Sequence, residues 1–162
     1  MIIIGGRFSE LGANKTAILM KLISNQDIVK CLVNNEMDFL DVQLPIDFDV
    51  ISLIHSQIFP YRFIPTIATD AKSFITMRFG YKPNGRTFKN GSVWFYIINH
   101  NSLLRTAYGT LRYDFLVNKI DEEFNSCEDL GFDKLEFYDM DEFIVNENYS
   151  GIYIAYKLRE FQ

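Results

Sequence analysis

Residues 92–98, "SVWFYII", are apolar on both faces if they form a strand. Successive side chains of a strand point to opposite faces, so Val93 and every second residue after it share one face. The other face carries the remaining large side chains of the segment, Trp94, Tyr96 and Ile98. A strand in a small antiparallel sheet usually has one buried and one solvated face. Two apolar faces therefore require protein on both sides of this strand.

The patterns around this segment predict an α+β fold. Helical spacing predicts helices over 14–24, with Asn14 as N-cap, over 24–34, with Ser24 or Asn25 as N-cap, and over 110–124. Alternation predicts strands over 72–81, 92–100, 133–138 and 150–161. Because a hairpin lies on each side of the long helix, we expect a single domain, residues 1–162, with an antiparallel sheet of about four strands and helices packed on one face.

Three connecting segments complete this organisation. Residues 34–50 are acidic and contain Pro45, which predicts a long loop. The segment "FPYRFIP" has two prolines, which predicts extended chain outside the hydrogen-bonded sheet. Residues 82–91, "KPNGRTFKNG", contain Asn-Gly twice and are predicted to be a hairpin tip.

Composition excludes some classes of protein. The net charge of −5 does not indicate a general nucleic-acid surface. No apolar run approaches the length of a membrane span. Cys31 and Cys127 have no metal-ligand or redox-motif spacing, so we interpret them as two reduced core thiols of an intracellular protein.

The net charge conceals a division along the chain. Residues 62–119 contain nine basic and two acidic residues, a net charge of +7. Residues 121–147 contain one basic and eleven acidic residues, a net charge of −10. These segments are either two solvated faces or a positive surface that meets a negative surface on a neighbouring copy.

Catalytic and metal-binding patterns are weak. The start "GGRFSELGANKT" does not have the P-loop spacing, because Ala13 and Asn14 intervene before Lys15. His55 and His100 have no metal-ligand spacing, and we expect His100 to bond local backbone at a strand end. The acidic run "DMDE" at 139–142 lacks the calcium-loop pattern and is interpreted as a solvated face. We therefore predict no catalytic residues, no metal site and no cofactor.

The long helix carries charges that oppose its own dipole. Arg112 lies near its N-terminus, preceded by Arg105, and Asp121, Glu122 and Glu123 lie near its C-terminus. In an isolated helix, the unfavourable charges at each end would lower helix stability by about a few tenths of a kcal/mol. We interpret the reversed charges as groups that pair with another surface.

Four segments follow one another along the chain: "ILMKLISNQDIVKCLVN", "IFPYRFIP", "KSFITMRF" and "GTLRYDFLVNKIDEEF", with a strand that ends in His100 before the last of them. In this order they resemble the small tail-terminator and head–tail neck (tail completion) proteins of tailed bacteriophages. The resemblance covers roughly residues 14–126. The long acidic loop and the final hairpin are less typical of the family.

The resemblance implies a structural virion protein that is not an enzyme and needs no cofactor. Copies of the family form a ring, commonly hexameric, that caps the tail tube, joins it to the head connector and leaves a channel for DNA. The predicted partners are therefore a second copy, the tail tube protein and a connector or neck protein, with no membrane. The predicted location is the virion neck, after assembly in the host cytoplasm.

Within that ring we expect two sets of contact residues. The predicted subunit or partner interface comprises Trp94, Tyr96, Ile98, Arg105, Arg112, Asp121, Glu122 and Glu123. The basic hairpin tip is predicted to reach the tail tube or the DNA path through Lys82, Arg86 and Lys89.

Two other classes of function remain open at this point. One is a regulatory binding domain whose apolar sheet face takes a peptide or a small ligand. The other is an enzyme or nucleotide-binding protein that uses the glycine-rich start or His100.

Overall fold

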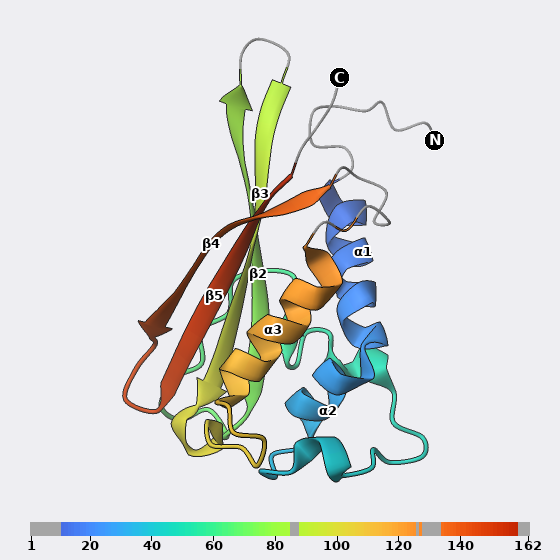
Figure 1. Cartoon of the computed structure of the whole chain (residues 1–162), viewed down its shortest axis with the longest axis vertical. Helices are drawn as coiled ribbons and strands as arrows, with labels where there is room; N and C mark the ends of the chain where they lie inside the picture. Colours follow the sequence, from blue (N-terminus) through green and yellow to red (C-terminus); the bar gives the residue numbers. More distant parts are fainter. Residues whose placement is uncertain (1–10, 85–87, 126, 128–133, 159–162) are drawn as a thin grey trace.

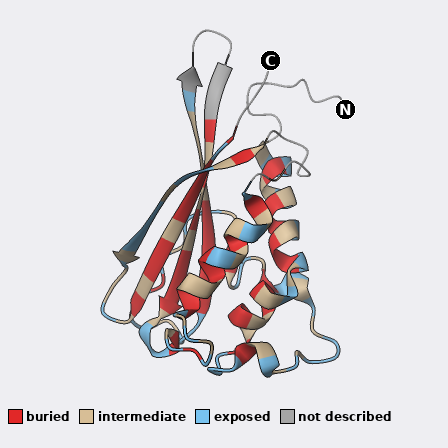
Figure 2. Cartoon of the chain, viewed as in Figure 1, coloured by how far each residue is buried: buried red, intermediate tan, exposed pale blue. Residues whose placement is uncertain are grey.

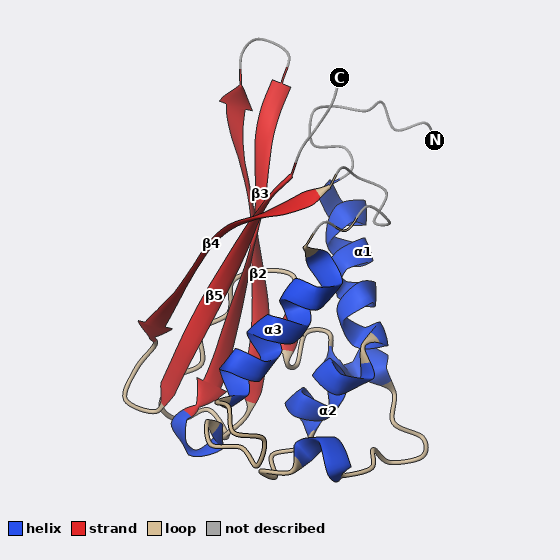
Figure 3. Cartoon of the chain, in the orientation of Figure 1, coloured by secondary structure: helices blue, strands red, loops and turns tan. Residues whose placement is uncertain are grey.

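The computed structural model describes residues 11–84, 88–125, 127 and 134–158 (Figure 1). Its helices are α1 (Leu11–Ser24), α2 (Gln26–Val33) and α3 (Arg112–Phe124), with short 3-10 helices η1 (Phe39–Asp41), η2 (Val50–Leu53) and η3 (Asn101–Leu103). Its strands are β1 (Ile58–Phe59), β2 (Ser73–Asn84), β3 (Phe88–His100), β4 (Leu135–Ile144) and β5 (Tyr149–Leu158). Helices α1, α2 and α3 lie on one side of the sheet, and loop covers part of its other side (Figure 3).

The predicted α+β class is confirmed, with five strands where about four were expected. The strand order is β1-β2-β3-β5-β4, and every pair except β1–β2 is antiparallel. The additional strand is β1, which ends at Phe59, the first residue of the segment predicted to lie outside the sheet. Ile58 and Phe59 pair with β2, and Pro60, which has no N–H donor, follows directly. The strand therefore contains only two residues.

One face of β3 packs against the helices. Val93, Phe95 and Ile97 are fully buried in the main core, beside Leu116 and Ile120 of α3. Figure 2 shows this buried layer between the sheet and the helices. Hydrophobic burial therefore holds the helical layer on one side of the sheet, as the alternation of β3 predicted.

Several predicted boundaries differ from the structure. Helix α1 begins at Leu11, so Asn14 is a buried residue inside the helix rather than its N-cap. Asn25 is the N-cap of α2, because its side chain accepts a hydrogen bond from the N–H of Ile28. The predicted hairpin tip at 82–91 is largely strand, since β2 and β3 pair as far as Asn84 and Phe88.

Arg112 is a core residue, and its predicted place in a subunit interface is wrong. Its relative exposure is 0%. The guanidinium donates to backbone carbonyls at the end of α2, at the turn after it and before α3: Cys31, Asn34, Asn35, Glu36 and Leu103. Its charge also lies 4.6 Å from the ring centroid of Phe39. A buried cation is tolerated here because every one of these carbonyls is a partner for it.

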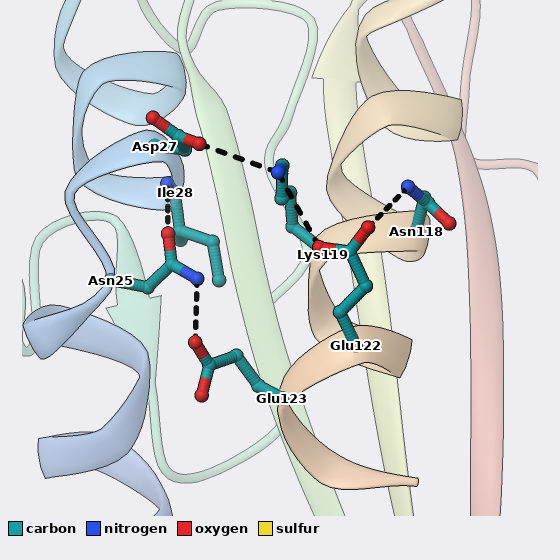
Figure 4. A network of polar contacts seen from close by, with 7 residues as sticks. All are labelled: Asn25, Asp27, Ile28, Asn118, Lys119, Glu122 and Glu123. Atoms are coloured by element: carbon teal, nitrogen blue, oxygen red, sulfur yellow. Dashed lines mark hydrogen bonds and ion pairs between the residues drawn. The ribbon is translucent and has the colours of Figure 1, made fainter.

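The opposite end of α3 meets the beginning of α2. Glu123 accepts a hydrogen bond of 2.8 Å from the Asn25 side chain and forms an ion pair with Lys21. Lys119 pairs with Asp27 of α2 and with Glu122, as Figure 4 shows. These acidic residues thus have partners within the chain.

The third acidic residue of this helix end is bound to the sheet. Asp121 accepts a hydrogen bond of 2.7 Å from the hydroxyl of Tyr156 on β5. Burial, together with this bond, raises the pKa of the Tyr156 hydroxyl, which stays a neutral donor. The reversed charges of α3 therefore pair within the same chain, and the predicted role of Asp121, Glu122 and Glu123 in a subunit interface stays a prediction.

We expect Arg112→Ala to destabilise the fold by about 3–5 kcal/mol, because several buried carbonyls lose their donor at once. Arg105→Ala is the matched control, since Arg105 is exposed and its loss should change stability by less than about 0.5 kcal/mol. Urea unfolding followed by circular dichroism measures both. A loss below about 1 kcal/mol for Arg112→Ala would contradict the central role of this side chain.

Candidate interface on the open face of the sheet

Four aromatic side chains from three strands form a continuous surface on the open face of the sheet. Trp94 and Tyr96 of β3 are half-buried there, with ring centroids 6.5 Å apart. Tyr153 of β5 lies opposite Tyr96, and its ring is 5.3 Å from that of Trp94. Phe143 of β4 completes the set, 5.9 Å from the ring of Tyr96. We call these four residues the aromatic row.

Two arginines lie along the β2 side of the aromatic row. Arg78 is the cross-strand neighbour of Trp94, and its guanidinium carbon lies 4.7 Å from the Trp94 ring centroid. Its Nε also donates to the Tyr96 hydroxyl at 3.4 Å. Arg62, from the segment after β1, lies 5.9 Å from the Tyr96 ring centroid. Each such cation–π contact contributes about 0.5–1 kcal/mol at an exposed site.

Carboxylates lie along the opposite side, on β4. Asp139 accepts a hydrogen bond of 3.0 Å from the Tyr153 hydroxyl. This bond, with some desolvation, raises the pKa of Tyr153 and keeps its hydroxyl a neutral donor. Asp141 is the cross-strand neighbour of Tyr153 and is exposed. The aromatic row therefore has arginines on its β2 side and carboxylates on its β4 side, where Lys157 of β5 also lies 4.5 Å from the ring centroid of Tyr138.

A pocket of about 240 Å³ opens at one end of the aromatic row. Its lining residues come from the segment after β1, the middle of β2 and β3, and the end of β4: Arg62, Phe63, Ile64, Thr76, Tyr96, Ile98, Phe143, Ile144 and Val145. The lining is mostly apolar, with Arg62 as its single charged side chain. We call this cavity the Arg62 pocket.

Gly151 allows the Phe143 ring to lie against the sheet beside this pocket. It is the cross-strand neighbour of both Ile98 and Phe143. A Cβ atom at this position would lie 2.5 Å from the Phe143 ring and 2.7 Å from the Ile97 carbonyl oxygen. The absence of a side chain is thus required by the close approach of both neighbours.

The chain itself covers part of the second face of β3. Ile98, which we predicted to contact a partner, is only 2% exposed. It packs in a second apolar cluster with Phe59, Phe74 and Tyr149. This correction has a simple cause, because the segment around β1 folds over the end of β3. Only the Trp94 and Tyr96 part of that face remains open.

The remaining predicted contact residues are only partly placed by the structure. Arg105 is exposed on the loop before α3, and Lys82 is exposed on β2. Arg86 lies outside the described residues, and the described side chains do not include that of Lys89. Their predicted roles stay predictions.

The structure gives the two histidines local partners. His100 Nδ1 accepts a hydrogen bond from the backbone N–H of Ser102 and so caps η3, which confirms its predicted local role. The His55 ring stacks on Tyr61 at 5.7 Å, with the backbone of His55 at a φ of 70°.

Among the described residues, no group of three or more His, Cys, Asp or Glu side chains is placed to hold a metal ion.

Cys31 is a buried thiol beside Arg112. Burial raises its pKa to about 12, which keeps it protonated at neutral pH. A protonated thiol is a poor nucleophile, so Cys31 has a packing role.

Most of the glycine-rich start lies outside the described residues, and Gly12 lies within α1.

Sequence reasoning missed four of the residues that build this surface: Arg62, Arg78, Phe143 and Tyr153. Each of these side chains joins the surface through a neighbour on another strand or loop. The sequence patterns did not predict the strand register, which decides these neighbours. The alternation of β5 was recognised, and it places Tyr153 on the face opposite to Ile152 and Ile154. That signal identifies the face of Tyr153 but not its neighbours.

Comparison with known proteins identifies a family for this chain. Residues 25–158 match the model of the YomW family, a name associated with phages and prophages. No curated protein and no solved structure matches the chain. No helix in the described part of the chain is long and apolar enough to cross a membrane.

We expect Gly151→Ala to destabilise the protein by about 1–3 kcal/mol, because the new methyl group collides with Phe143 and with backbone. Gly12→Ala is the control, since nothing lies within 4 Å of a Cβ atom there. This helical substitution should stabilise by up to about 1 kcal/mol. Chemical unfolding of both variants measures the difference, and equal effects would contradict the close packing at Gly151.

Proposed function

The chain belongs to the YomW family, and from this premise we propose that it is a structural protein of a phage virion and not an enzyme. In this proposal, copies join head to tail into a ring of about six subunits. The ring caps the tail tube, joins it to the head connector and leaves a channel for DNA. The observation that carries the proposal is the opposite charge of the two edges of the sheet.

The two sheet edges differ in charge and lie at opposite ends of the strand order. β4 forms one edge and contributes Asp139, Asp141 and Glu142. On the other side, Arg78 lies on β2 and Arg62 on the segment that follows β1. A head-to-tail ring joins two different surfaces of the same chain, so this arrangement supports ring closure over a symmetric dimer.

The β2 edge is the one placed to pair with a strand of a neighbouring copy. The pairing of β1 with β2 ends at Thr76, and the described residues include no strand beyond it along the rest of β2. An edge of this kind pairs readily with another strand. On the β4 edge, the N–H groups of Met140 and Glu142 already donate to the side chains of Asp139 and Asp141, so that edge offers its carboxylates rather than these N–H groups.

The aromatic row supplies the apolar part of the proposed interface. Trp94 and Tyr96 are of the residue types that contribute most to binding at protein interfaces. Neighbouring Arg78 belongs to the same class. Their half-buried state leaves ring surface that a second copy would remove from water.

The proposed partners are a second copy, the tail tube protein and a connector or neck protein. DNA passes through the ring without sequence recognition. Exposed Lys82 on the β2–β3 hairpin supports a contact between that hairpin and the tube or the DNA path. The proposed location is the virion neck, after assembly in the host cytoplasm.

The Arg62 pocket favours a second candidate function. A regulatory binding domain would use such an apolar cavity for a small ligand or a peptide side chain. Its volume of about 240 Å³ lies below the range of about 300–1,000 Å³ typical of small-molecule sites. The pocket therefore suits a single side chain better than a whole ligand.

The solution mass tests the proposal. We expect a discrete oligomer of about six copies at low salt that dissociates at high salt, because exposed charge pairs are screened within about 3 Å at 1 M salt. Light scattering after size exclusion measures the mass. Trp94 is the single tryptophan, so its emission should shift to shorter wavelength on association.

A second variant makes the test specific. Trp94→Ala should weaken association at least about tenfold, as expected for a central aromatic anchor. A chain that stays monomeric at every concentration and also fails to bind purified tail tubes would overturn the ring proposal. The small-ligand function would then be tested by thermal stabilisation in a ligand screen.

A further inference from the structure

The loop between η1 and η2 presents an exposed apolar side chain. Ile46 has a relative exposure of 102%, so it makes almost no contact with its own chain. It lies in a tight turn closed by a hydrogen bond of 3.0 Å from the N–H of Phe48 to the carbonyl of Pro45. A single exposed apolar side chain is common on protein surfaces, so a contact site also requires a matching cavity and complementary charge.

This turn is anchored on both sides. Leu44 and Phe48, which flank it, pack against the main core. Asp49 accepts a hydrogen bond from the N–H of Ile51 and so fixes the beginning of η2. A fixed turn loses little conformational entropy when it binds, which favours association. We call residues 45–47 the Ile46 turn.

The charges of the Ile46 turn and of the Arg62 pocket are complementary. Asp47 and Asp49 are exposed beside Ile46. The single charged residue of the pocket lining is Arg62, and Arg78 lies close by along the aromatic row. An isoleucine entering the pocket would therefore bring a carboxylate to the guanidinium at its wall.

The pocket matches a branched aliphatic side chain in character and size. Ile98, Phe63 and Phe143 provide apolar contacts, and the volume of about 240 Å³ holds one side chain rather than a drug-sized molecule. Insertion would remove apolar surface of both the side chain and the pocket from water, which stabilises the contact by about 25 cal/mol for each Å² buried.

The turn and the pocket lie on different sides of the molecule. Residues 42–49 follow the outer side of α2 in the helical layer, as Figure 1 shows. The pocket opens on the sheet face that turns away from the helices. Ile46 of one chain therefore cannot enter its own pocket, but it can enter the pocket of a second copy.

We propose that Ile46 of one copy inserts into the Arg62 pocket of the next copy, with Asp47 paired to Arg62. This inference rests on the proposed ring and identifies one of its contacts. The contact joins two different surfaces, so it repeats from copy to copy in one direction. It uses the acidic loop at 34–50, which is less typical of the family that the chain resembles.

Ile46→Asp tests the contact without disturbing the fold, because the side chain is fully exposed. We expect a loss of association of at least about tenfold, as measured by sedimentation over a range of protein concentrations. Ile67→Asp is the matched control, since Ile67 is 60% exposed and is not among the residues that line the Arg62 pocket. It should associate as the unaltered chain does.

Charge exchange tests the pairing of Asp47 with Arg62. Either Asp47→Arg or Arg62→Glu alone should weaken association, and the chain with both substitutions should recover it. Mixing provides a second test. Ile46→Asp chains keep an intact pocket and Arg62→Glu chains keep an intact turn, so the mixture should form heterodimers that neither variant forms alone.

The outcomes separate this contact from the ring itself. An Ile46→Asp chain that still forms the large oligomer would overturn the contact and leave the ring proposal standing. A dimer of the unaltered chain that Ile46→Asp abolishes would support the contact and overturn the ring. An unaltered chain that is monomeric at every concentration would overturn the contact.

Discussion

The buried guanidinium of Arg112 determines how the helical layer is assembled. It binds carbonyls at the end of α2 and in the turn that follows, and so places a positive charge at the negative end of the α2 dipole. At the other end of the same helix pair, Glu123 bonds Asn25, the N-cap of α2. Helices α2 and α3 are antiparallel. The charges at the two ends of α3 therefore oppose the dipole of α3 but complement the dipole of α2. Charges that are unfavourable in an isolated helix thus stabilise a pair of helices.

The same layer determines what remains of the sheet for other contacts. Once α1, α2 and α3 cover one face, the doubly apolar strand β3 needs a second cover. The segment around β1 supplies part of it, through Phe59 and its neighbours over Ile98. It does not extend to Trp94, which keeps exposed ring surface beside Arg78. The proposed interface is therefore the part of the second face that the chain does not cover itself.

The proposed ring and the proposed Ile46 contact share one physical requirement. A closed ring needs two unlike surfaces on each copy, placed so that one meets the other. Charges of opposite sign at the two sheet edges meet this requirement along the sheet. The exposed Ile46 turn and the Arg62 pocket meet it again, between the helical side and the open face. The two pairs of complementary surfaces share Arg62, and together they support assembly over a solitary role.

The sequence by itself determined the α+β class, the long helix and the presence of two apolar faces on β3. These features follow from local periodicity, which each segment of chain carries without reference to the others. Only the tertiary structure decided the fate of individual side chains. Arg112 and Ile98 became core residues, while Arg62, Phe143 and Tyr153 joined Trp94 and Tyr96 on the open face. The physical reason is that burial and pairing depend on strand register and on loops that fold back, and neither is encoded in the spacing of neighbouring residues.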